Sequence, residues 1–215
     1  MSTTKSIDSF TSFVSSWLQE ERTSRIQTYF EDIFIRGKEQ LHGVQFPPGS
    51  RAQIRQCLIK PEKIAALFKN TQQDPDKSPN AVEGHLEDWM VKTTQDCATE
   101  LARKLPVNPE AHPIPLSAST LPKFLETDRA IVEVFKDNCF PCHFNAAKLK
   151  CAADKLYPTH PLYTIPLDRA KTLLPDLSKQ VQGTPELYEH NSHNGTYTCL
   201  DSAKIWKIIE EHCSK

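Results

Sequence analysis

Two cysteines spaced three positions apart, Cys139 and Cys142, stand between a run of β-branched residues and a helical pattern. The run, residues 130–135 (AIVEVF), is typical of a strand buried in the middle of a sheet. A helix is predicted from about Pro141 to Leu156, because proline is tolerated in the first turn of a helix. Any fold for this chain must therefore place both cysteines where a central strand passes into a helix.

This position gives the two thiols different chemistry. Cysteines at positions i and i+3 of a helix N-terminus can close a short disulfide, and the helix dipole favours a thiolate on the first sulfur. We expect Cys139 to be the nucleophile and Cys142, one turn further along, to resolve the mixed disulfide.

The elements around this segment alternate between strand and helix from residue 112 to the C-terminus. We predict strands at 114–116, 130–135, 162–167, 186–188 and 196–200, and helices at 120–127, 141–156, 170–177 and from Asp201 or Ser202 onwards. Asn194-Gly195 is a hairpin-turn signal between the last two strands. The order is β-α-β-α-β-α-β-β-α.

This ordered set resembles the thioredoxin and protein disulfide isomerase family. The segment IVEVFKDNCFPCHF is similar to the family's central strand, active site and helix start, and Glu133 lies six residues before Cys139, where the family has a buried acidic residue. Gly183-Thr184-Pro185 is similar to the family's cis-proline turn.

The resemblance implies a fold and a site. It implies an α/β thioredoxin-like domain over residues 112–215, with a central mixed sheet flanked by helices. Glu133 would relay a proton for the resolving thiol, and Thr184 and Pro185 would present backbone groups to an extended substrate. Phe140 and Pro141, between the cysteines, would contact that substrate. The implied function is thiol–disulfide exchange with protein thiols or disulfides.

The surroundings of the cysteine pair depart from the family's pattern. Asn138 stands where the family has Trp, Lys136 and Asp137 replace a small or apolar pair, and Ala147 replaces a helix-kinking proline. The alternative hypothesis is therefore a non-catalytic subunit, in which the fold is a scaffold within a larger protein complex.

The first half of the chain is predicted to be entirely helical. Apolar residues recur every three or four positions in four stretches, around 7–18, 26–34, 64–68 and 82–105. Residues 70–80 are predicted to form a polar loop. Pro106, Pro109, Pro113 and Pro115 give a stiff connector. We therefore expect a helical N-terminal region over 1–106, a proline-rich linker at 107–111 and the second domain at 112–215. The helical region would anchor the chain to neighbouring subunits under the scaffold hypothesis.

The cysteine pair also matches two metal-site patterns. Cys139, Cys142 and His143 also form CxxCH, the attachment signal for c-type haem, but the preceding strand has no role in a small helical cytochrome. A zinc site of Cys139, Cys142, Cys151 and His160 would require the helix to break, since Cys151 lies roughly 13 Å along its axis from Cys142. We expect no metal and no cofactor.

The composition of the chain argues against two classes of binding partner, nucleic acid and membrane. The chain has 26 basic and 27 acidic residues, balanced in both halves, which argues against binding to nucleic acid. No apolar run is long enough to span a membrane.

The remaining cysteines are scattered. Seven cysteines is an odd number, and a secreted disulfide scaffold would be shorter and denser in cysteine. We therefore expect Cys57, Cys97, Cys151, Cys199 and Cys213 to be reduced thiols. This favours an intracellular protein, and the Ser- and Thr-rich N-terminus favours a mitochondrial over a cytosolic location. The sequon Asn194-Gly195-Thr196 is accordingly interpreted as a turn.

Overall fold

A computed structural model of the chain describes residues 3–73, 78–108 and 110–213. The chain divides into two compact units. The helical unit comprises residues 1–34 and 47–103, and the sheet unit comprises residues 35–46 and 104–215. Pro109 of the predicted linker and the middle of the predicted 70–80 loop lie outside the described residues.

The helical unit is built from amphipathic helices, as the apolar spacing predicts. Its helices are α1 (Thr3–Gln19), the first part of α2 (Glu21–His42), α3 (Ser50–Leu58), α4 (Pro61–Gln73) and α5 (Pro79–Ala102). Helix α3 lies outside the four stretches in which apolar residues recur, and α4 continues three residues past Asn70, where a loop was expected to begin. Within the described residues, no helix is long and apolar enough to cross a membrane.

The sheet unit contains a five-stranded sheet in the order β1-β3-β2-β4-β5. Its strands are β1 (Ile114–Pro115), β2 (Ala130–Phe135), β3 (Leu162–Pro166), β4 (Glu186–Asn191) and β5 (Thr196–Cys199). β1, β3 and β2 are parallel to one another, whereas β4 runs antiparallel to β2 and β5 antiparallel to β4. The β2 prediction is confirmed to the residue, and all six of its side chains are buried.

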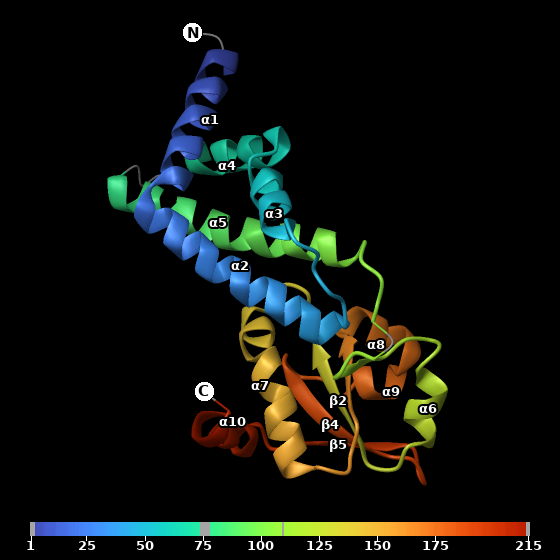
Figure 1. Cartoon of the computed structure of the whole chain (residues 1–215). Coiled ribbons are helices and arrows are strands. Elements are labelled where there is room, and N and C mark those ends of the chain that lie inside the picture. Colours follow the sequence, from blue (N-terminus) through green and yellow to red (C-terminus); the bar gives the residue numbers. More distant parts are fainter. Residues whose placement is uncertain (1–2, 74–77, 109, 214–215) are drawn as a thin grey trace. The chain divides into compact units, whose positions relative to one another are not determined.

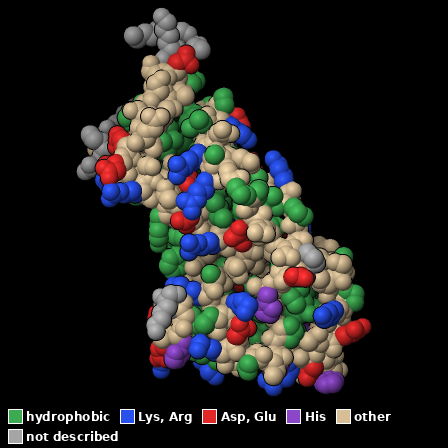
Figure 2. All heavy atoms as spheres, viewed as in Figure 1, with side chains coloured by type: hydrophobic (Ala, Val, Ile, Leu, Met, Phe, Trp, Pro, Cys, Tyr) green, Lys and Arg blue, Asp and Glu red, His purple; other side chains and the backbone are tan. Residues whose placement is uncertain are grey.

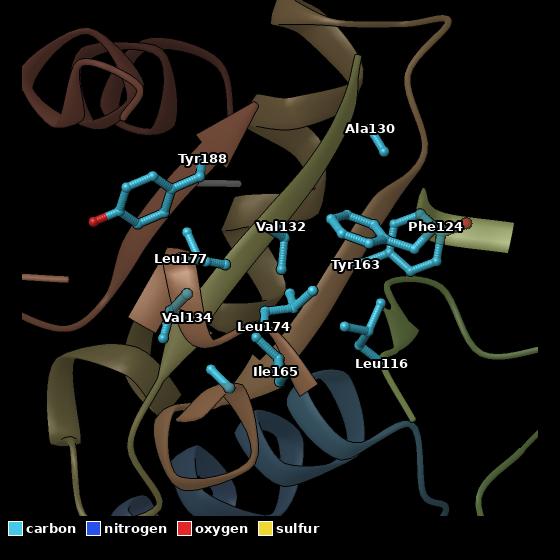
Figure 3. Close-up of a cluster of buried hydrophobic side chains, with 11 residues drawn as sticks. Leu116, Phe124, Ala130, Val132, Val134, Tyr163, Ile165, Leu174, Leu177 and Tyr188 are labelled. Atoms are coloured by element: carbon cyan, nitrogen blue, oxygen red, sulfur yellow. The ribbon is translucent and has the colours of Figure 1, made fainter. Parts of the chain in front are cut away.

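Helices cover both faces of this sheet (Figure 1). Because side chains alternate along a strand, Val132 and Val134 pack on one face and Ile131 on the other. The first face is covered by α6 (Leu121–Glu126), α8 (Leu167–Leu173) and α9 (Pro175–Ser178), and Figure 3 shows Leu174 and Leu177 converging on Val132, Val134 and Ile165. The second face is covered by α7 (Phe140–Leu156) and α10 (Ser202–His212). The sheet unit thus has a thioredoxin-like α/β fold, as the resemblance implied.

The end of α2 also belongs to the sheet unit. Residues 35–46 were expected in the N-terminal helical region, but they pack against the thioredoxin-like fold. The buried hydroxyl of Thr164 in β3 donates to the Leu41 carbonyl at 2.8 Å, and the amide of Asn108 donates to the Gly43 carbonyl at 2.7 Å. Gly43 has φ 61°, and a Cβ there would lie 2.4 Å from Pro115, so glycine is required for this approach.

Candidate functional site

Cys139 and Cys142 lie at the N-terminus of α7, directly after β2, and form a disulfide. Cys139 is the N-cap residue of α7, and its Sγ accepts a hydrogen bond from the Cys142 amide at 3.2 Å. Cys139 is half-buried, whereas Cys142 is fully buried against Phe135 and Ala146. Cys139 is therefore partly open to solvent and lies at the helix N-terminus, whereas Cys142 is closed off from solvent.

The Thr184–Pro185 turn faces the disulfide. The Thr184 carbonyl oxygen lies 3.4 Å from Cys139 Sγ, and the Thr184–Pro185 peptide bond is cis. Glu186 holds this turn, since its carboxylate accepts hydrogen bonds from the Gly183 amide at 2.9 Å and from the Tyr188 hydroxyl at 2.6 Å. The sulfur and the turn thus meet although 45 positions separate them in the chain.

Phe140 and Pro141, the two residues between the cysteines, are exposed. The Phe140 ring stacks on Phe144, also exposed, with centroids 5.9 Å apart. Pro141 lines a pocket of about 370 Å³ together with Thr184 and Pro185. All four residues expected to bind substrate therefore lie around the disulfide, in positions open to a ligand.

Glu133 is fully buried in β2. Strand alternation places it on the α7 face of the sheet, between Ile131, which packs with Leu149, and Phe135, which packs with Cys142. Neither carboxyl oxygen has a hydrogen-bond partner among the described residues, and burial raises the pKa of Glu133 to about 8. This carboxyl group therefore holds a proton at neutral pH, and its pKa lies near that of an ordinary thiol.

A charged cluster that the sequence analysis missed lies beside the cysteine pair. The fully buried ammonium of Lys38 in α2 donates to Asp137 Oδ1 at 2.7 Å and to the Asp137 carbonyl at 3.1 Å. His42 Nε2 lies 2.8 Å from the same Oδ1. Burial alone would raise the pKa of Asp137, but the His42 hydrogen bond and the Lys38 charge outweigh it and hold that pKa well below its usual range. The spacing of Lys38 and His42, four residues apart on a helix, was the available signal.

His143 links α2 to the cysteine helix. Its Nδ1 donates to the Cys139 carbonyl at 2.7 Å, and burial, aided by the positive charge of Lys38, lowers its pKa to about 3. Gly37 lies against it so closely that a Cβ there would be 2.7 Å from the His143 Cα. His143 is therefore a neutral packing residue of this site.

The expectation of reduced thiols elsewhere is wrong for four cysteines. Cys57 pairs with Cys97, and Cys151 with Cys213. The pairs join residues 40 and 62 positions apart, which meet because α3 packs on α5 and α10 packs on α7. Sequence periodicity gives no such information. Cys199 is free, as expected, but it is exposed.

The cysteines of the haem and zinc alternatives take part in disulfides. Cys139 and Cys142, required for both haem attachment and zinc, are bonded to each other, and Cys151 is bonded to Cys213. In the part of the chain that the structure describes, no group of three or more His, Cys, Asp or Glu side chains is arranged to hold a metal ion.

Comparison with solved structures gives a weak likeness. No family model matches the sequence, and no curated protein matches it. The J-Trx1 fragment of ERdj5, a crystal structure, is similar over 82% of this chain and 96% of that fragment, with 16% sequence identity and a TM-score of 0.36. A likeness of that strength has no bearing on function, so the strand order and helix placement identify the fold.

Proposed function

We propose that this protein is a thiol–disulfide oxidoreductase that acts through Cys139 and Cys142. The observation that carries the proposal is the Cys139–Cys142 disulfide at the N-terminus of α7, with Cys139 Sγ 3.4 Å from the Thr184 carbonyl. A sulfur in this position is accessible, its thiolate is favoured by the helix N-terminus, and a neighbouring backbone carbonyl borders the space that a substrate would enter.

The reaction is a two-step exchange. In the reduced protein, the Cys139 thiolate attacks one sulfur of a substrate disulfide, forms a mixed disulfide and expels the other substrate sulfur as a thiolate, which takes a proton from water. The Cys142 thiol then loses its proton and attacks Cys139 Sγ, which releases the remaining substrate thiolate. The substrate gains two electrons, and the Cys139–Cys142 disulfide is formed.

Glu133 serves the second step in this proposal. Because Cys142 is shut off from solvent, its proton needs an acceptor within the protein. With a pKa of about 8, Glu133 is mostly protonated at neutral pH, and its ionised fraction accepts the Cys142 proton. The transfer costs little free energy, since an ordinary thiol has a pKa near the same value. Phe140, Pro141, Thr184 and Pro185 bind the extended polypeptide around the reacting sulfur.

The test uses disulfide reduction with a matched thiol control. We expect the protein, recycled by dithiothreitol, to accelerate reduction of insulin, and Cys139→Ser to abolish this activity. Cys199→Ser removes the exposed free thiol, which lines the same pocket as Pro141 and Thr184, and shows whether that thiol contributes to the rate. In the reduced protein, the pH dependence of alkylation of Cys139, located by peptide mass spectrometry, should give a pKa below the ordinary 8.5. An unshifted thiol together with no turnover would refute the enzyme and leave the scaffold.

A second function, a non-catalytic subunit of a protein complex, is favoured by the surface of the helical unit. Phe13, Tyr29 and Ile59 are 48%, 55% and 46% exposed there. On the face in Figure 2, basic and acidic side chains are interspersed, so apolar contact is the more specific means of attachment. Stoichiometric co-purification of other subunits with the tagged protein from its native source would establish this function, and recovery as a single component would refute it.

The two long-range disulfides give information on the cellular compartment of the protein. Disulfides such as Cys57–Cys97 and Cys151–Cys213 persist in oxidising compartments and are rare where thiols are kept reduced. We propose that the assembly is a mitochondrial protein complex and that it lies in an oxidising compartment. Alkylation of unreduced extracts, followed by mass spectrometry of the four cysteines in fractionated cells, tests both the redox state and the location.

A further inference from the structure

We infer that Lys38 is a positioning residue of the dithiol site, which pairs with the Asp137 carboxylate and thereby keeps that negative charge from opposing the Cys139 thiolate. The inference rests on the proposed function and assigns to it a residue outside the thioredoxin-like fold. Lys38 lies in α2, and the strands and helices of that fold begin only at residue 114.

The burial of Lys38 is the first observation. Its side chain has no exposed surface, and a buried ammonium group is costly unless it is paired and hydrogen-bonded. Lys38 Nζ makes two contacts with one residue, at 2.7 Å to Asp137 Oδ1 and 3.1 Å to the Asp137 carbonyl. Packing of the aliphatic part of Lys38 alone would not explain hydrogen bonds to both the side chain and the backbone of Asp137.

The place of Asp137 is the second observation. It lies two residues before Cys139, in a turn closed by a hydrogen bond of 3.1 Å from the Cys139 amide to the Lys136 carbonyl. The Asp137 side chain is 25% exposed, so solvent screens its charge only partly. An ionised carboxylate on the residue two positions before Cys139 raises the free energy of the thiolate, and a positive charge bound to that carboxylate offsets the effect.

The same part of α2 packs on the two cysteines. Leu41, one helical turn after Lys38, shares a buried cluster with Phe135 and Cys142, against which Cys139 also packs. Gly37 lies against His143, whose Nδ1 binds the Cys139 carbonyl. The Lys38 ammonium is therefore held at a fixed place beside the turn.

Charge pairing predicts opposite effects for the two partners. In Lys38→Met, the Asp137 carboxylate keeps its contact with His42 but loses the buried ammonium, so the pKa of Cys139 should rise, on the order of one unit. In Asp137→Asn, the Lys38 charge is left without its anion, so the pKa of Cys139 should fall. In the double variant both charges are absent, and the pKa of Cys139 should return close to that of the unaltered protein. A purely structural role would move all three variants in the same direction or leave the thiol unchanged.

The experiment measures the rate of alkylation of Cys139 against pH in the reduced, full-length protein, with the modified site located by peptide mass spectrometry. Lys38→Arg should rescue the Lys38→Met shift, because arginine keeps the charge. Lys136→Met is the matched control: it removes an exposed positive charge from the same turn, and its shift should be much smaller because solvent screens that charge.

The outcomes separate this inference from the proposed function. A low Cys139 pKa that stays the same in Lys38→Met, or that the double variant fails to restore, overturns the role of Lys38 and leaves the enzyme proposal intact. An ordinary thiol pKa in the unaltered protein overturns the enzyme proposal itself. If Lys38→Met does not fold, as judged by circular dichroism, a fall in Asp137→Asn that the double variant reverses still supports the inference, and no fall in Asp137→Asn overturns it.

Discussion

Replacing Glu133 with Gln removes a buried ionisable group while keeping nearly the same volume beneath the cysteine pair. Burial raises the pKa of Glu133 from 4.5 to about 8, so folding holds a proton that the unfolded chain releases. The contribution of protonated Glu133 to the free energy of unfolding is fully present below pH 4.5. It is lost as the pH rises toward 8. At 1.36 kcal/mol per pKa unit, the whole loss is about 5 kcal/mol, of which about 3 kcal/mol falls below pH 7.

The assay compares the two proteins at the same pH, so that other titrating groups cancel. Hydrogen exchange of the β2 and β3 amides reports the free energy of opening of the sheet unit alone. Glu133→Gln should be close to the unaltered protein at pH 5 and more stable by a few kcal/mol at pH 8. A constant difference between the proteins across this range would show that Glu133 titrates normally, and would refute both its burial and its role as a proton acceptor near neutral pH.

Two further predictions concern the framework of the site. Replacing Cys151 and Cys213 together by Ala should destabilise the sheet unit by about 4 kcal/mol in urea unfolding, because the disulfide closes a loop across 62 positions; a change below 1 kcal/mol would mean that the pair is not bonded in solution. Gly37→Ala should destabilise the protein, since a Cβ would lie 2.7 Å from the His143 backbone. The control Gly84→Ala, in a helix with open space around that position, should be neutral or stabilising. Equal effects of the two substitutions in thermal unfolding would contradict the close packing of α2.

Much of the sheet unit follows from local sequence. The β-branched run at 130–135 favours a strand that is buried on both faces, and the bounds of β2 agree with the prediction. Asp201 or Ser202 was expected to cap the last helix. Asp201 does so, since its carboxylate accepts hydrogen bonds from the amides of Ala203 and Lys204. These features depend on neighbours within a few residues, which is why a sequence reveals them.

Features that depend on distant partners were not predictable in this way. Cysteine counting cannot choose among pairings, so Cys57–Cys97 and Cys151–Cys213 emerged only when helix packing brought the sulfurs together. Helix α3 was missed because it is only nine residues long, too short for its apolar positions to form an extended pattern.

The contribution of α2 shows why the resemblance to a family describes this site incompletely. In the sequence, Asp137 is a departure from the family's pattern without evident cause. In the structure it is the partner of Lys38, 99 positions earlier, and of His42. Because Asp137 lies two residues before Cys139 and contacts two side chains of α2, Asp137 and the end of α2 must be considered together. A boundary drawn at residue 112 from the family pattern separates the two charges and leaves the carboxylate unpaired beside the dithiol.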